Sequence, residues 1–304
     1  MALRQTAPLA WCGWRIQVPE QWRPLRVAGD WDRGSMIIGD ATEAVAQVSW
    51  SRPKKKRFDA GRPFARRLKR MRRTAASGGP EPEGFAETAW SPGDDEHPAF
   101  WAGYAPDAGL VVEALTSAEA PKRKQRSVTR RGLPTLRASR PAEPTPWAVY
   151  GASFVSPPGF TLRDRRLKLG DIALRTRSRD RKTLLLRAVY PADLALARRE
   201  LADWLEFPVF KEHRRFRPEM VDPNWQVDSF GRTLGGVRRV GRKRIPRPLG
   251  WIASRHSSGA VVHDEELDRL LITELDTPAP HGEAALAGIV ETMGWAHFEP
   301  EGLW

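Results

Sequence analysis

"GWRIQVPEQW", residues 13–22, and "GASFVSPPGF", residues 151–160, are the two stretches that decide the fold. Aligned with each other, they agree at four positions: Gly13 with Gly151, Ile16 with Phe154, Pro19 with Pro157, and Trp22 with Phe160. In each stretch an apolar run ends at a proline, which ends ladder pairing because it has no N–H. An aromatic residue follows three positions later, and its ring can fold back onto a sheet. The recurrence indicates that one structural unit occurs twice.

The segments that follow these two stretches also match in order. Residues 34–40 resemble residues 170–176, and residues 44–50 resemble residues 183–189. In the first half, apolar and polar residues alternate as in a half-buried strand. We predict a helix after each set, around 62–75 and 191–206, then further strands, and a last helix around 282–293. The expected fold class is α+β, with two repeated units, each an antiparallel β-meander packed against helices. Two similar hairpins that arose by chance are the alternative.

The predicted domain boundaries follow from this repeat. The first α+β repeat covers residues 1–119 and the second covers residues 147–304. Between them, residues 120–146 are rich in Pro, Ser and basic residues, which is typical of an exposed linker.

The order of a strand, a proline, an aromatic residue, a meander and a helix resembles the PsbP-like α/β/α sandwich superfamily. The residues that carry the resemblance are "IQVPEQW" (16–22) and "FVSPPGF" (154–160). The resemblance would cover both halves, and it implies a non-enzymatic binding or assembly factor, an adaptor rather than a catalyst. It transfers no functional residue to this chain. The N-terminus also departs from the lumenal members, because it lacks the apolar stretch of an export signal.

Composition narrows the class of protein further. The 304 residues include 50 basic and 37 acidic ones, for a formal net charge of +13, together with 13 tryptophans. Such a charge favours an acidic partner, although Arg-rich usage throughout the chain is the alternative explanation. With Cys12 as the single cysteine, no internal disulfide is possible. We find no apolar run long enough for a membrane span, and we expect a cytoplasmic protein. The sequence does not indicate an oligomeric state.

The most basic stretch, Arg52 to Arg73, holds 12 Lys or Arg residues against one Asp. Within it, Phe64, Leu68, Met71 and Ala75 have the spacing of a core-facing helical stripe. The remaining positions are cationic, whereas the helix predicted around 191–206 is close to neutral there. Packing therefore does not require this charge, and we predict that it binds an anionic macromolecule. A merely solvated face is the alternative. The candidate binding residues are Lys54, Lys55, Lys56, Arg66, Arg67, Lys69, Arg70, Arg72 and Arg73.

Other features could extend this surface. A second basic cluster occupies residues 231–248, and residues 122–131 supply further Lys and Arg. If Trp22, Trp31 or Trp50 were exposed beside these cations, they could form a stacking platform for single-stranded nucleic acid. Packing in the core is the alternative for each tryptophan.

The sequence contains no complete catalytic motif. "GVRRVGRK" (236–243) resembles a phosphate loop but lacks a Lys directly after the second Gly, so glycines at hairpin bends are the better interpretation. No His has metal-ligand spacing with another His or with Cys12. The acidic runs 93–97 and 263–268 could weakly hold a hard cation, but solvated turns fit them better.

We therefore predict a non-enzymatic protein with no metal and no cofactor, whose basic helix face contacts an anionic macromolecule such as nucleic acid. One alternative is an assembly or adaptor protein that docks an acidic protein partner, since Arg pairs well with carboxylates. A second alternative is an enzyme with a cleft between the repeats.

Overall fold

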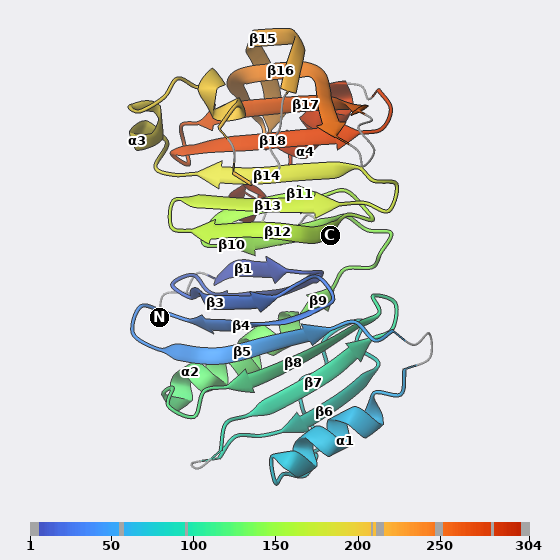
Figure 1. The fold of residues 1–304 in the computed structure, drawn as a ribbon. Helices are drawn as coiled ribbons and strands as arrows, with labels where there is room; N and C mark the ends of the chain where they lie inside the picture. Colours follow the sequence, from blue (N-terminus) through green and yellow to red (C-terminus); the bar gives the residue numbers. More distant parts are fainter. Residues whose placement is uncertain are drawn as a thin grey trace. The chain divides into compact units, whose positions relative to one another are not determined.

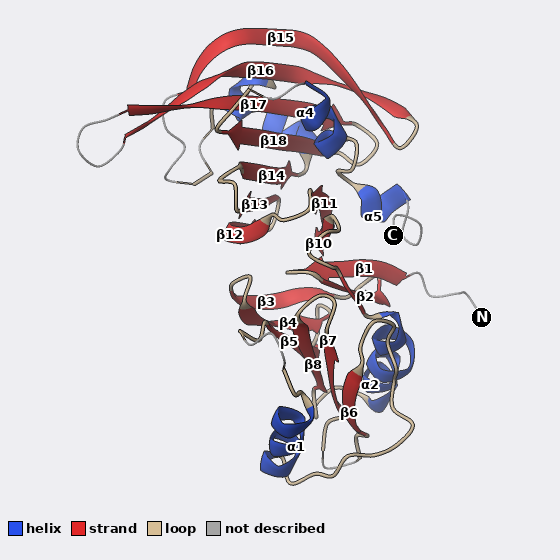
Figure 2. Cartoon of the chain, turned by 90° about the vertical axis from the view of Figure 1, so that its right-hand side faces the viewer, coloured by secondary structure: helices blue, strands red, loops and turns tan. Residues whose placement is uncertain are grey.

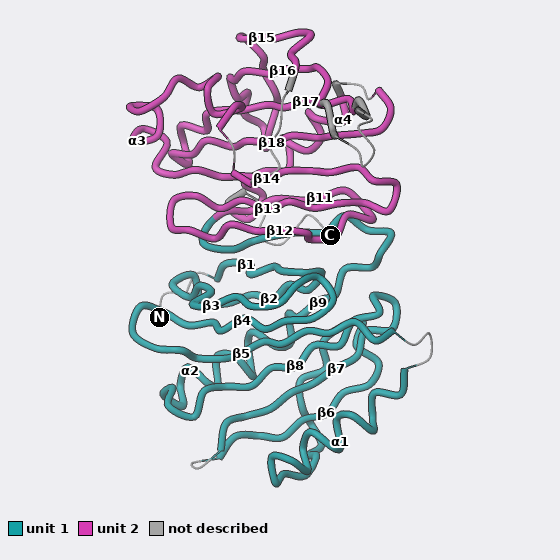
Figure 3. Tube along the Cα trace, in the orientation of Figure 1, with its two compact units in different colours: residues 1–151 teal, residues 152–304 magenta. Residues whose placement is uncertain are grey.

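The structure is a computed structural model. It describes residues 6–54, 58–94, 97–207, 209–210, 216–246, 252–280 and 283–298. The chain divides into two compact units, residues 1–151 and 152–304, which Figure 3 shows in different colours.

The first unit consists mainly of short strands (Figure 1). Its elements in chain order are β1 (Thr6–Trp11), β2 (Trp14–Pro19), β3 (Arg23–Gly29), β4 (Arg33–Gly39), β5 (Ala44–Ser51), α1 (Gly61–Arg70), β6 (Glu87–Ser91), β7 (Phe100–Ala105), β8 (Leu110–Thr116), α2 (Lys122–Ser127), the π-helical turn η1 (Val128–Gly132), the 3-10 turn η2 (Leu133–Thr135), β9 (Arg137–Ala138) and β10 (Thr145–Val149).

The second unit has longer strands. Its elements are β11 (Ala152–Ser156), β12 (Thr161–Lys168), β13 (Asp171–Arg177), β14 (Thr183–Val189), α3 (Ala192–Leu196), the 3-10 turn η3 (Ala202–Leu205), β15 (Phe216–Ser229), β16 (Arg232–Pro246), β17 (Ile252–Asp264), β18 (Arg269–Thr277), α4 (Glu283–Val290) and α5 (Trp295–Phe298).

Each unit has a large antiparallel sheet. The strand order is β3-β4-β5-β8-β7-β6 in the first unit and β12-β13-β14-β18-β17-β16-β15 in the second. In both, a three-stranded meander leads into a helix, and a second meander returns so that its last strand pairs with the third strand of the first. In a separate small sheet of the first unit, β10, β1, β2 and β9 are neighbours in that order. The predicted α+β class with antiparallel sheets is confirmed.

The landmarks seen in the sequence occupy matching places. Cys12 and Gly13 connect β1 to β2 with φ angles of 47° and 84°, and Tyr150 and Gly151 precede β11 with φ angles of 52° and 77°. Two positive φ angles in succession are typical of a two-residue type I′ hairpin turn, which favours Gly. After β2, the Trp22 N–H donates to the Pro19 carbonyl (2.8 Å). After β11, the Phe160 N–H donates to the Pro157 carbonyl (3.4 Å).

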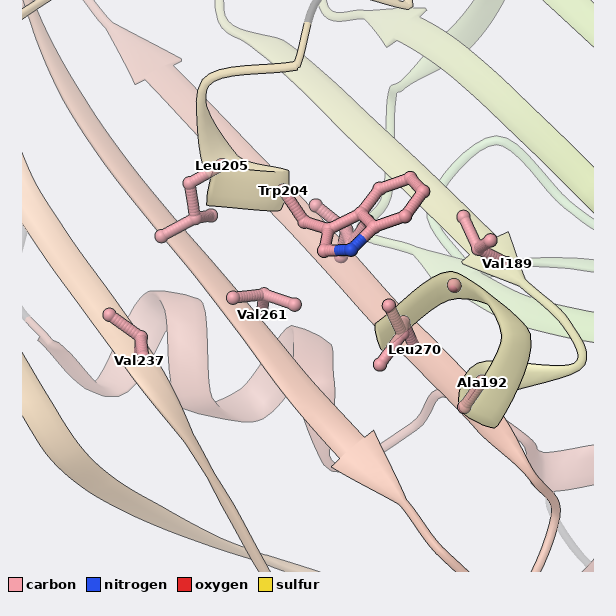
Figure 4. Packing of buried hydrophobic residues seen from close by; sticks show 9 residues of the cluster. Val189, Ala192, Trp204, Leu205, Val237, Val261 and Leu270 are labelled. Atoms are coloured by element: carbon pink, nitrogen blue, oxygen red, sulfur yellow. The ribbon is translucent and has the colours of Figure 1, made fainter. Parts of the chain in front are cut away.

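Helices cover the sheets through buried apolar clusters. In the first unit, Figure 2 shows α1 and α2 on opposite sides of the large sheet. Phe64 and Leu68 of α1 pack with Phe100, Tyr104 and Val111 of the sheet. Figure 4 shows the corresponding cluster of the second unit, where α3 and η3 pack on Val189, Val237, Val261 and Leu270. Within the described residues, no helix is both long and apolar enough to cross a membrane.

Three local predictions are wrong. Residues 120–146 were expected to form an exposed linker, but they contain α2, η1 and η2, with Val128, Leu133 and Leu136 buried. The helix expected at 191–206 is broken into α3 and η3, and Leu194 of α3 is 62% exposed. Gly236 and Gly241 lie inside the continuous strand β16 rather than at hairpin bends.

Candidate cationic binding surface

The helix α1 is fixed to the sheet by its apolar side and by its N-terminus. Phe64 and Leu68 are buried, at 2% and 4% exposure. The first free N–H groups of the helix, those of Ala60 and Gly61, donate to Glu87 Oε2 at 3.0 and 3.1 Å. A carboxylate in this position satisfies backbone donors and interacts favourably with the helix dipole. The opposite side of α1 is therefore held outward.

That outward side carries unpaired positive charge. Arg66, Lys69 and Arg70 of α1 are exposed, and so is Arg72 just beyond the helix end. Among the described residues, no carboxylate lies within 4.0 Å of these four side chains; the pairs at α1 are Arg62–Asp59 (3.3 Å) and Arg67–Glu113 (3.6 Å). We call Arg66, Lys69, Arg70 and Arg72 the cationic surface of α1.

The helix ends earlier than predicted, because the chain turns into the left-handed region at Arg72 (φ 56°). The Arg72 N–H donates to the Lys69 carbonyl (3.0 Å), and the Arg73 N–H donates to the Leu68 carbonyl (2.9 Å). These two bonds form a Schellman motif, whose left-handed position is usually Gly. Arg72 and Arg73 are thus not helical residues, and Ala75 is exposed rather than part of the apolar stripe.

The nine predicted site residues therefore differ in exposure and in their contacts with the rest of the fold. Lys54 is exposed, whereas Lys55 and Lys56 lie outside the described residues. Arg67 belongs partly to the fold, because it pairs with Glu113. The Arg73 side chain is half-buried, donates to Ser91 Oγ (3.4 Å), and has its pKa lowered by burial. Arg73 therefore supports the turn after α1 rather than the outward surface.

The second basic cluster differs from the cationic surface of α1, since carboxylates of its own unit pair with its described cations, residues 232–243. The N–O distances are 2.7 Å for Arg232–Asp264, 3.9 Å for Arg238–Asp222, 3.3 Å for Arg239–Glu274, 3.0 Å for Arg242–Glu219 and 3.2 Å for Lys243–Asp276. Burial lowers the pKa values of Arg239 and Lys243. Buried cations need such partners, since an unpaired charge in a low dielectric is costly.

The cations of residues 122–131 lie on another side. They belong to α2 and η1, and α2 lies on the opposite side of the sheet from α1 in Figure 2. Lys124 pairs with Asp40 and Glu43, and these hydrogen bonds raise its pKa. Arg123, Arg126, Arg130 and Arg131 are exposed. The expectation that this segment extends the α1 surface is wrong.

None of Trp22, Trp31 and Trp50, the candidates for a stacking platform, is fully exposed. Trp22 and Trp50 are buried at 6% and 3% exposure, and Trp50 Nε1 donates to the Asp30 carbonyl (2.9 Å). Trp31 is half-buried, with the Arg52 guanidinium 4.3 Å from its ring centroid. The core interpretation of the tryptophans holds for the first two, and the third is occupied by a cation–π contact.

Carboxylates of the two acidic runs accept hydrogen bonds from nearby backbone N–H groups. Asp94 accepts the His97 N–H (2.7 Å) in a turn. Asp193, His263 and Asp268 offer ligand atoms within 4.8 Å of one another, which could hold a metal ion. Asp268 Oδ1, however, already accepts the N–H groups of Ala192 (2.8 Å) and Asp193 (3.2 Å).

Sequence reasoning missed a buried ion pair in the second unit. Arg187, 1% exposed, forms a bidentate pair with Asp171 (2.8 and 3.1 Å) and stacks on Trp204 at 5.1 Å. The signal was available, because Arg187 is the single charged residue in the apolar run "TLLLRAV". Such an arginine in a buried strand needs a carboxylate partner.

Comparison with known protein families, with curated proteins and with solved structures gives no match to this chain.

Proposed function

We propose that this protein is a non-enzymatic binding protein whose cationic surface of α1 neutralises the phosphates of a nucleic acid. One observation carries the proposal: four neighbouring cations are exposed with no described carboxylate within 4.0 Å, whereas the described cations of residues 232–243 pair with carboxylates of their own unit. Phosphate neutralisation releases counterions and gives affinity without base specificity.

The backbone at Arg72 supports the same proposal. A bulky residue in the left-handed region is disfavoured, and Gly would satisfy the Schellman motif at less cost. Strained positions that keep a charged side chain often serve a function. Arg72 follows Arg66, Lys69 and Arg70 in the chain and is exposed as they are, so the residue that strains the turn also adds a charge at the end of the helix.

We further propose that the two units are copies of one α+β repeat that later diverged. The matching strand orders, the matching type I′ turns and the matching proline-to-aromatic hydrogen bonds support this. The second copy has α3 and η3 where the first has α1, and its charges there are mixed: Arg198, Arg199, Glu200, Asp203 and Glu206. Binding would thus be a property gained or kept by the first copy alone.

The test is a charge reversal on α1. Arg66→Glu, Lys69→Glu and Arg70→Glu together should weaken binding of a labelled mixed-sequence DNA duplex at least tenfold. The slope of log K against log salt should become shallower by about 2.7, since each lost phosphate contact removes about 0.9. The matched control is Arg123→Glu, Arg126→Glu and Arg130→Glu on α2 and η1, which makes the same change in net charge.

Equal losses in the two triple variants would reject α1 as the binding surface, because net charge alone would then account for the affinity. Capture of one stoichiometric acidic protein that resists nuclease and needs the α1 cations, with no affinity for DNA, would instead establish the adaptor alternative.

A further inference from the structure

The side of the large sheet that carries α1 is only half covered. α1 packs on β6, β7 and β8, where Phe100, Ala102 and Val111 are buried. In Figure 2 no described helix lies against β3, β4 and β5 on that side. This uncovered part begins at β5, the strand next to β8, which α1 reaches through the Arg67–Glu113 pair.

Strand register shows which side chains occupy this uncovered part. Residues directly opposite each other in an antiparallel ladder lie on the same face of the sheet. Three rows run from β8 to the edge strands: Leu115–Gln47–Ile37–Arg26, Glu113–Ser49–Ser35–Ala28, and Val111–Ser51–Arg33. Val111 packs under α1 and Glu113 pairs with Arg67 of α1, so all three rows lie on the α1 side.

We call the β3–β5 part of these rows the open half: Arg26, Ala28, Arg33, Ser35, Ile37, Gln47, Ser49 and Ser51. Each of these residues is exposed or half-buried. On the reverse face of the same strands, Met36, Ile38, Val48 and Trp50 are at most 3% exposed. The open half is thus a solvent-facing surface with a firm core behind it.

The composition of the open half matches a phosphate backbone. Arg26 and Arg33 are exposed, and among the described residues no carboxylate lies within 4.0 Å of either side chain. Between them lie neutral hydrogen-bonding groups, three serine hydroxyls and the Gln47 amide. Arginines together with such groups make the usual contacts to phosphate and sugar. Glu113, the acidic residue at the border with α1, is already paired with Arg67.

The open half begins one strand away from the strand that α1 reaches. Arg67 of α1 pairs with Glu113 of β8, and Ser49 of β5 lies directly opposite Glu113 in the sheet. From β8 to β3 there are three strand spacings, or about 14 Å. The strands from β8 to β3 are therefore wide enough together for phosphate contacts beside α1. Its described side chains include no aromatic ring, since Trp50 points to the other face.

We propose that the phosphate–sugar backbone of a nucleic acid lies across the open half beside α1, with Arg26 and Arg33 as phosphate contacts and with no base stacking. This rests on the proposed function of α1. It adds two binding residues that lie far from the basic stretch in the sequence. It also specifies the readout, which uses the backbone and ignores base identity.

The experiment compares two double variants of the full chain with wild type on the same labelled DNA duplex. Arg26→Glu with Arg33→Glu should weaken binding at least fivefold and make the salt slope shallower by about 1.8, for two lost phosphate contacts. Arg130→Glu with Arg131→Glu, on the turn η1 that directly follows α2, is matched in charge and should change the slope by less than half as much. Single-stranded dT and dA oligomers of one length should bind wild type equally.

The outcomes separate the two proposals. If the α1 triple variant loses affinity while Arg26→Glu with Arg33→Glu behaves like its control, the open half is not part of the site and the function of α1 stands. If neither variant loses affinity, both proposals fail. A marked preference for one oligomer would overturn the backbone-only readout. Arg26→Gln with Arg33→Gln keeps hydrogen bonding without charge reversal, and it should reproduce the loss of slope if the charge-reversed variant does not fold.

Discussion

Replacement of Arg72 separates the strain of the turn from the charge that it carries. Arg72 has φ 56° at the left-handed position of the Schellman motif. For a residue with a Cβ, this conformation costs about 1–2 kcal/mol, whereas Gly adopts it freely. Gly also gains about 0.4–1 kcal/mol of unfolded-state entropy, which opposes the relief. Arg72→Gly should therefore exceed Arg72→Ala in unfolding free energy by about 1 kcal/mol.

Arg72→Ala is the control for Arg72→Gly, because both variants remove the same charge. Urea denaturation followed by far-UV circular dichroism measures the difference in stability. Both variants should weaken DNA binding alike and make the salt slope shallower by about 0.9, for one phosphate contact. Equal stability of the two variants would refute the strain, and wild-type affinity in either would remove Arg72 from the binding surface.

Three further outcomes follow from the described contacts. Phe64→Ala removes the 2% exposed anchor of α1, so it should cost about 3–5 kcal/mol in denaturation and also lower DNA affinity. Asp171→Asn leaves Arg187 buried without its carboxylate, and it should cost about 3–5 kcal/mol without changing DNA binding measured in the folded range. The hydrogen bond from Lys124 lowers the pKa of Asp40, so this carboxylate contributes stability above its unfolded pKa that is lost on acidification. The stability of Asp40→Asn should therefore fall less than that of wild type below about pH 4, which thermal unfolding across pH would show.

The sequence was informative wherever one local pattern determines one local structure. Gly13, Pro19 and Trp22 predicted a hairpin and a proline-ended strand, because each has a restricted backbone or a large ring to bury. Phe64 and Leu68 predicted the buried side of α1 by their spacing. The outward direction of Arg66 and Arg70 followed from the same spacing.

Predictions failed where distant residues decide the outcome. Residues 120–146 look like a linker because they are rich in Pro, Ser and basic residues, yet Val128 and Leu133 are buried, which local composition does not reveal. Glu113 and Asp222 lie far in sequence from the cations that they neutralise, so counting charges along the chain overstated the free charge. Arg26 was overlooked as a candidate binding residue, because only strand register places it on the same side of the sheet as α1.

Salt separates the two roles of charge in this protein, since it should act on stability and on binding with opposite signs. Arg66 and Arg70 are four residues apart on α1, and like charges at this spacing oppose the helix by about 0.2–0.5 kcal/mol. Arg66→Gln should therefore raise stability at low salt while it weakens DNA binding. At 1 M salt the Debye length falls to about 3 Å, so wild type should recover that stability while its affinity disappears. Thermal unfolding and DNA titration of the two proteins at both salt concentrations measure this. If the stability gain of Arg66→Gln persists at 1 M salt, repulsion between the cations of α1 does not lower the stability of the protein. The unpaired charge of α1 would then not differ in energy from the paired charges of the second unit.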